Sequence, residues 1–184
     1  MKSTVLIAAL SIALFAGCTT TNSKPAIVAL PADSLVANID KYHNVTVEVE
    51  GIIVHLCGVD GKKMKLMTES GAIIKIVPID SLASFDEAFC DHRVRVRGMV
   101  RESRIETSSI DRMAQQRAIL CHIDHAPCKD SAWVKQKEEA GAADTISMQC
   151  IDKLRAKMKQ TGRSYVSVIT IIAEKVELVV PEKK

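Results

Sequence analysis

Alternation of apolar and polar residues dominates the first half of the chain. Within residues 43–57, Val45, Val47 and Val49 alternate with polar residues, which is the period-two pattern of a strand with one buried face. Gly51 interrupts this stretch, and a glycine inside a strand typically marks a bulge or a sharp bend. Turn residues separate the apolar stretches that follow, which predict three more strands at 63–67, 72–77 and 93–97.

Three other stretches predict the remaining elements that accompany these strands. Residues 31–41 place Leu35, Val36 and Ile39 on one side and begin with a proline, so they predict a short helix whose first residue is Pro31. Residues 79–91 are expected to form a short helix or loop between the third and fourth strands. Strand-type alternation returns over 165–180 and predicts the last strand.

A different spacing separates the fourth strand from the last one. Over 106–163, apolar residues recur three and four apart in two stretches, which predicts two helices. The first is expected to begin near Ser108, and if it continues to residue 125, before the break at Ala126-Pro127, Cys121 and His125 share a face. The second is expected to begin at residues 144–145 and to end at Gly162, and residues 129–143 before it are expected to form a charged loop with helical tendency.

The order of these elements predicts the fold class. A long bent strand, three further strands, a short helical segment and a closing strand are the elements of an OB-fold-like five-stranded Greek-key barrel with helices. The sequence therefore predicts one domain over residues 31–180, with a helical hairpin inserted at about 106–163 between strands 4 and 5. Loops accept such insertions because the entropy of loop closure grows slowly with length.

The N-terminus has the pattern of a targeting segment. Lys2 is followed by an uncharged apolar run, residues 5–15, which is shorter than the ~20 residues that span a bilayer. The junction Ala16-Gly17-Cys18 resembles the lipobox of bacterial lipoproteins. That resemblance implies a signal peptide over 1–17, lipidation of Cys18 by acyl chains such as palmitate, and a tether over 18–30. The expected location is the cell envelope, on the outer membrane facing the periplasm.

A second resemblance concerns the first hairpin. The segment from Val49 through His55 and Cys57 to Lys63, together with residues 95–105 and 158–165, resembles small OB-fold envelope proteins related to anticodon-binding-like barrels. Their pattern, written His-x-Cys-x-His-Gly-Gly-Lys-Lys, departs here at Val59 and Asp60, which replace the second His and a Gly. The resemblance implies a fold and an envelope location, and it carries no activity.

Composition and charge narrow the classes of function. The formal net charge is +3, and Lys and Arg residues on the predicted strands are interleaved with acidic ones, so no nucleic-acid partner is expected. Aromatic residues make up 3% of the chain, too few for stacking on bases. No phosphate-binding glycine loop, nucleophile elbow or His-Glu-x-x-His motif is present, so the chain is not expected to be an enzyme.

Cysteine and histidine residues are the best candidates for site chemistry. Cys121, His125 and Cys128 lie close in sequence, and Cys150 on the second predicted helix is able to approach them, which would suit Zn²⁺ or Cu(I). The favoured alternative is two disulfides among the five cysteines other than Cys18, with Cys128 paired to Cys150 or Cys121, and no cofactor is expected in that case. Free buried thiols are the third possibility. His55 and Cys57, two residues apart, and Lys63 form a candidate ligand face at the barrel mouth.

These observations leave two functions open. The leading prediction is a membrane-anchored, non-enzymatic OB-fold binding or interaction module, whose partner is the membrane and either an envelope protein or an anionic polymer. The alternative is a metal-binding or redox-responsive envelope protein that uses Cys121, His125, Cys128 and Cys150.

Overall fold

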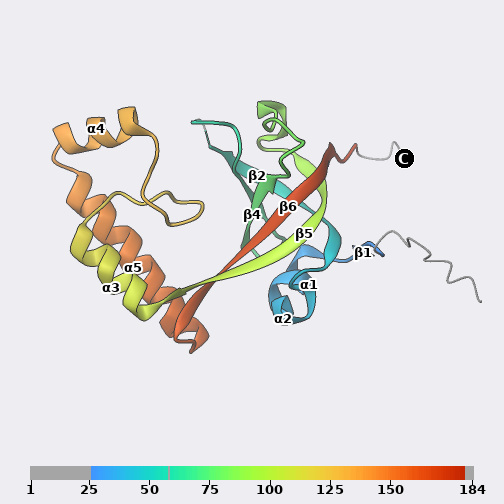
Figure 1. Cartoon of the computed structure of the whole chain (residues 1–184), viewed down its shortest axis with the longest axis horizontal. Helices are drawn as coiled ribbons and strands as arrows, with labels where there is room; N and C mark the ends of the chain where they lie inside the picture. Colours follow the sequence, from blue (N-terminus) through green and yellow to red (C-terminus); the bar gives the residue numbers. More distant parts are fainter. Residues whose placement is uncertain (1–25, 58, 181–184) are drawn as a thin grey trace, which may run out of the picture.

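A closed barrel of five strands forms the centre of the molecule (Figure 1). The structure is a computed structural model that describes residues 26–57 and 59–180. The barrel strands are β2 (Thr46–Leu56), β3 (Met64–Met67), β4 (Ile73–Pro78), β5 (Arg93–Glu106) and β6 (Tyr165–Leu178). Their order is β2-β3-β4-β6-β5, and pairing of β5 with β2 closes the barrel. The predicted OB-fold-like barrel with helices is confirmed.

The alternation seen in the sequence decides which side chains enter the barrel. Val47, Val49, Ile74 and Ile76 are fully buried, whereas the residues between them are more exposed. Gly51 is required by close packing, because a Cβ there would lie 2.7 Å from the carbonyl oxygen of Met67 and would overlap the Leu66 side chain.

Small elements close the barrel at its ends. The N-terminal strand β1 (Val28–Ala29) pairs in parallel with β2 and leads into the short helices α1 (Ala32–Ala37) and α2 (Ile39–Tyr42). Pro31 is the N-cap of α1 and not its first residue, so the helix begins one residue later than predicted. The segment between β4 and β5 contains only the 3-10 turn Glu87–Phe89.

The insertion folds as a separate helical layer with its own core. Helices α3 (Thr107–Gln116) and α5 (Ala143–Thr161) pack together, and α4 (Ser131–Glu139) lies at their far end (Figure 1). In Figure 1, β5 and β6 extend from the barrel as a two-stranded ribbon that carries this layer. Ile105 and Val166 on that ribbon join Ile110, Ile151 and Leu154 in the second core.

The first inserted helix is shorter than the sequence predicted. α3 ends at Gln116, because Arg117 adopts a left-handed conformation with φ of 49°. The chain then forms a tight hairpin in which Leu120 faces Pro127 and the Cys121 N–H donates to Ala126 O at 2.7 Å. The predicted helical face shared by Cys121 and His125 is therefore wrong. Ile119, Leu120 and Cys121 are consecutive and all buried, as in an extended segment covered on both sides, and Ile123 in the turn is buried as well.

The other expected boundaries agree more closely. Gly162 caps α5 with φ of 64°, as predicted. The helical tendency expected within the 129–143 loop takes the form of α4, whose N-terminus is capped by Asp130 accepting the Trp133 N–H. The signal peptide, Cys18 and most of the tether lie outside the described residues. Among the residues that are described, no helix combines the length and apolar character needed to cross a bilayer.

The expected disulfides are not found. Cys57, Cys90, Cys121, Cys128 and Cys150 are all thiols. Cys121 and Cys128 are diagonal neighbours across the 119–128 hairpin, a relation that places Cα atoms ~7–8 Å apart, beyond the usual span of a disulfide. Cys128 and Cys150 line different cavities. Neither preferred pairing of Cys128 is present.

Candidate binding groove

A long groove separates the barrel from the insertion. Its upper part is a cavity of about 490 Å³, walled on one side by Lys65, Ile73 and Lys75 of β3 and β4 and on the other by α5. Its lower part, about 820 Å³, continues between the β3–β4 turn and α5. The two parts share Ile73, Lys153, Lys157, Ser167 and Ile169, so we treat them as one feature, the basic groove.

Positive charge and a lack of carboxylates define this groove. Lys65, Lys75, Lys153, Lys157 and Arg163 line it, and no Asp or Glu is among the described residues that do so. The chain has 22 acidic residues, so this distribution is not a consequence of composition. Glu102 lies behind the wall, where Ser167 Oγ donates to it at 2.6 Å and Arg104 pairs with it at 2.9 Å.

Lys65 lies in the interior of the groove. Burial lowers its pKa, and the charge of Lys153 adds to that effect although the cysteines nearby oppose it. Within the described part of the chain, neither Lys65, Lys153 nor Lys157 takes part in an ion pair. An anion bound between them would therefore find ammonium groups without carboxylate partners.

A smaller cavity opens on the other side of the 119–128 hairpin. It measures about 240 Å³ and shares Leu120, His122, Ile123 and Trp133 with the basic groove. The residues singled out by the sequence that line it are His55, Cys57, Lys63, Cys121 and Cys128. We refer to it as the thiol cavity.

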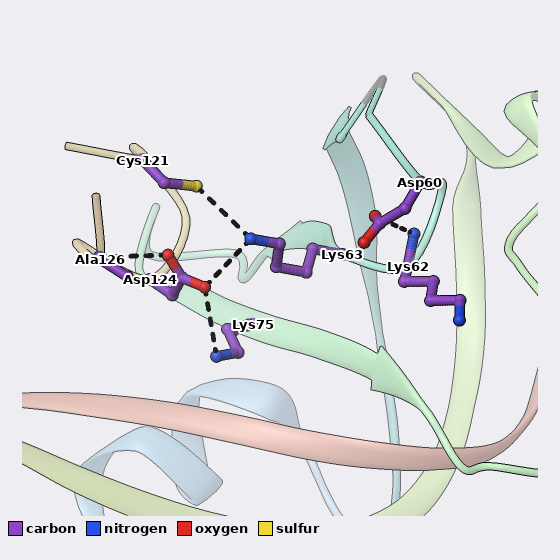
Figure 2. Close-up of polar contacts among 7 residues, drawn as sticks. All are labelled: Asp60, Lys62, Lys63, Lys75, Cys121, Asp124 and Ala126. Carbon is purple, nitrogen blue, oxygen red and sulfur yellow. Dashed lines mark hydrogen bonds and ion pairs between the residues drawn. The ribbon is translucent and has the colours of Figure 1, made fainter. Parts of the chain in front are cut away.

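One carboxylate fastens the hairpin to the barrel (Figure 2). Asp124 Oδ2 lies 3.2 Å from Lys63 Nζ and 3.9 Å from Lys75 Nζ, and its other oxygen accepts the Ala126 N–H. Burial alone would raise the pKa of Asp124, but hydrogen bonds from Lys63 and Ala126 hold that pKa below its usual value. Lys63 Nζ also lies 4.0 Å from Cys121 Sγ, so it faces both the hairpin and the thiol cavity.

Imidazoles stand at the junction of the two cavities. The His55 and His122 rings meet edge to face with centroids 4.3 Å apart. Loss of water around the His122 ring lowers its pKa to about 4, with the positive charge of Lys65 as the next cause. Burial also lowers the pKa of His125, whose Nδ1 lies 3.8 Å from Cys150 Sγ. At neutral pH these rings are therefore uncharged.

The structure divides the predicted metal ligands into two pairs. Cys121 and Cys128 line the thiol cavity, whereas His125 and Cys150 line the basic groove. No three His, Cys, Asp or Glu side chains in residues 26–57 and 59–180 are placed to hold one metal ion. The predicted ligand face of His55, Cys57 and Lys63 does come together, in the thiol cavity.

Sequence reasoning missed the residues that define the groove. Lys65 and Lys75 fitted the solvated face of two predicted strands, and Lys153 and Lys157 on the second predicted helix were not singled out. The spacing of Lys153 and Lys157, four apart on the same helix as Cys150, was the available signal. No protein-family model matches the chain, and a search of curated proteins finds no match to it. The geometry of the groove is therefore the main evidence for the function.

Proposed function

We propose that this chain is a membrane-anchored envelope lipoprotein that acts as a non-enzymatic binding module, with an anionic ligand held in the basic groove. The observation that carries the proposal is the groove lining, which contains Lys65, Lys153, Lys157 and Arg163 and no carboxylate among the described residues. OB-fold barrels commonly bind ligands on the face formed by their second and third strands, here β3 and β4, which supports the choice of groove.

The anchor is supported by the N-terminal sequence alone. Lys2, the apolar run and Ala16-Gly17-Cys18 occur in the order of a lipoprotein signal. Expression of the full chain with a labelled palmitate precursor tests this. We expect label on the natural chain and none on Cys18→Ser. Equal labelling of both proteins, or no label on either, would contradict the anchor.

Charge reversal tests the ligand site. Lys153→Glu and Lys157→Glu place a carboxylate in the groove, whereas Lys159→Glu makes the same charge change on α5 outside it. With inorganic tripolyphosphate and decaglutamate as probes and the full chain in detergent, we expect each groove variant to bind at least ~10-fold more weakly, and Lys159→Glu to bind like the natural chain. Equal weakening in all three, or no binding by the natural chain, would refute the proposal.

A metal-binding or redox-responsive protein is the second candidate. One observation favours it: Cys57, Cys121 and Cys128 line the same cavity, with Lys63 Nζ close to Cys121 Sγ. Thiolates suit Cu(I) and Zn²⁺, and a nearby ammonium stabilises a thiolate. Stoichiometric metal in protein purified without chelator, lost in a Cys121→Ser, Cys128→Ser variant, would favour this function over the first.

A further inference from the structure

We propose that the ligand of the basic groove is an extended acidic peptide of a partner protein, which pairs with β6 as an added strand. This inference rests on the proposed function, because it uses the same groove, and it names the class of ligand. Three independent features support it: an open strand edge, a cavity beside that edge, and the charge of the opposite wall.

The open edge follows from unequal strand lengths. β6 pairs with β5 along Tyr165–Leu178, but its parallel ladder with β4 covers only Thr170 to Ala173. β4 begins at Ile73, and the register of this ladder, when extended, places Ile73 beside Val168, so no β4 residue lies beside the first three residues of β6. Among the described strands, the stretch from Tyr165 to Ser167 therefore has a partner on the β5 side only.

The direction of the backbone groups on that edge is fixed by the ladder. Ala173 O accepts a hydrogen bond from Ile79 N at 2.9 Å, on the β4 side. Backbone groups alternate sides along a strand, and the β5–β6 register is regular from Tyr165 to Ala173. The N–H and C=O of Ser167, six residues before Ala173, therefore point toward the groove and away from β5. Unpaired groups of this kind form a template for another strand.

Space for such a strand lies directly beside this edge. The lower part of the groove, about 820 Å³, is lined by Tyr165, Val166 and Ser167 on the β6 side, by Gly71–Ile73 across from them, and by α5 above. Adjacent strands need ~4.8 Å between backbones. In Figure 1, α5 and the β5–β6 ribbon converge at the lower left, where the chain passes from α5 into β6.

The groove walls specify the side chains of the peptide. Lys153, Lys157 and Arg163 offer positive charge, and Ile73 and Ile169 offer apolar contact. Successive side chains of a strand point to opposite faces. A segment in which Glu or Asp alternates with Val or Ile would present carboxylates to α5 and apolar side chains to the barrel. Main-chain hydrogen bonds would supply affinity and the two walls specificity, as in other strand-addition complexes.

Backbone methylation separates strand addition from simple attraction of charge. The probes are a labelled ten-residue peptide of alternating Glu and Val, the same peptide N-methylated on every Val, and the same peptide N-methylated on every Glu. All three carry the same charge, but only one methylated set faces β6. With the full chain in detergent, we expect one methylated peptide to bind at least ~10-fold more weakly and the other to bind like the parent. Equal affinity of all three, or equal loss in both methylated peptides, would overturn the inference.

Two substitutions at Ser167 provide a second test of strand addition. Ser167→Pro removes the N–H that points into the groove and leaves the β5 ladder intact. Ser167→Ala keeps that N–H and loses the same hydroxyl bond to Glu102. We expect ~10-fold weaker binding of the parent peptide by Ser167→Pro relative to Ser167→Ala, with tripolyphosphate binding unchanged between them. Equal peptide affinities in two folded variants would also overturn the inference.

The outcomes separate the anionic ligand of the proposed function from the acidic peptide of this inference. Binding of tripolyphosphate without binding of any peptide would reject the peptide and keep the anionic ligand. Loss of all binding would reject both. A dimer in analytical ultracentrifugation that the peptide dissociates would show that a second copy of this chain occupies the groove, which also overturns the inference.

Discussion

At the scale of single residues, Asp124 links the hairpin of the insertion to the barrel. Its ion pair with Lys63 is largely shielded, with side-chain exposures of 18% and 16%, and Lys75 adds a weaker contact. We expect Asp124→Asn to lower the free energy of unfolding by about 1–2 kcal/mol, because two ammonium groups lose their shared anion. Chemical denaturation measures this, with Asp152→Asn, an equal charge change on the exposed side of α5, as the control.

The pH dependence of this effect has a definite sign. The pKa of Asp124 is below its unfolded value, so its contribution is complete above the unfolded pKa of about 4. It is lost as the pH falls through the lower pKa of the folded protein. We expect the natural chain and Asp124→Asn to differ most near neutral pH and to converge in acid. A difference that persists at pH 2 would show that the Asp124 pair is not its source.

The pKa of His122 is sensitive to the charges that line the groove. Its pKa of about 4 depends on partial loss of water and, next, on the positive charge of Lys65. We expect Lys65→Met to raise the pKa of His122 toward its usual 6.5, and Lys62→Met, at an exposed position, to leave it unchanged. An NMR titration of the ring protons measures both. A bound anion should also raise the pKa of His122, so the same titration detects a ligand.

Protonation of His122 also links folding to pH. Because the pKa is lower in the folded than in the unfolded chain, the unfolded state binds the proton more tightly. The contribution of His122 to stability is therefore complete above pH 6.5 and is lost as the pH decreases toward 4. Sequence reasoning identified His55, His125 and the cysteines as candidates, but not His122, Lys65 or Asp124, since the roles of these three residues depend on the docking of a loop that no local pattern encodes.

At the scale of elements, Gly98 controls how β5 and β6 run together. The register shifts at Arg97 and Gly98, and a Cβ on Gly98 would overlap the carbonyl of Ile172 and lie 2.8 Å from Ala173 Cα. Because these atoms are backbone, they cannot move aside cheaply. We expect Gly98→Ala to cost more than 2 kcal/mol of stability in chemical denaturation.

Gly162→Ala provides the comparison for that substitution. Gly162 has φ of 64° but nothing within 4 Å of an added Cβ, so only conformational strain of ~1 kcal/mol is expected. A cost for Gly98→Ala that is no larger than that for Gly162→Ala would contradict the role assigned to the close approach of the strands.

The elements also show what the sequence encodes locally. Alternation over Thr46–Leu56 and Tyr165–Leu178 predicts strands because it reflects burial on one side of each strand. Residues 119–125 of the hairpin were expected to continue the first inserted helix, because Leu120 and Cys121 fit a helical repeat with Met113. The left-handed residue Arg117 ends that repeat, and arginine gives no sequence signal for that conformation.

At the scale of the whole molecule, two cores share one pair of strands. The barrel core includes Val96 and Ile171, and the second core joins Ile110, Ile151 and Leu154 to Ile105 and Val166 at the far ends of β5 and β6. The sequence predicted an inserted helical hairpin but not its position over β3 and β4, which depends on long-range packing. In the described part of the chain, the β5–β6 ribbon and the 119–128 hairpin join these two layers, and the groove lies between them.

This arrangement predicts that the barrel stays folded when the helical layer is destabilised, whereas the helical layer depends on the barrel. Leu154 is 3% exposed in the second core, so Leu154→Ala should remove about 2–5 kcal/mol from that layer. Hydrogen exchange should then quicken for amides of α3 and α5 while β2, β3 and β4 keep their protection, because the barrel core does not include Leu154. The variant should also bind tripolyphosphate more weakly, since α5 forms one wall of the groove.

Val96→Ala is the matched substitution in the barrel, where Val96 is fully buried on β5. Unfolding of the barrel separates β5 from β6 and so removes Ile105 and Val166 from the second core. We therefore expect faster exchange in both layers for Val96→Ala. Exchange that quickens in both layers for Leu154→Ala as well would mean that the molecule unfolds as one unit, and that the groove opens only when the barrel itself unfolds.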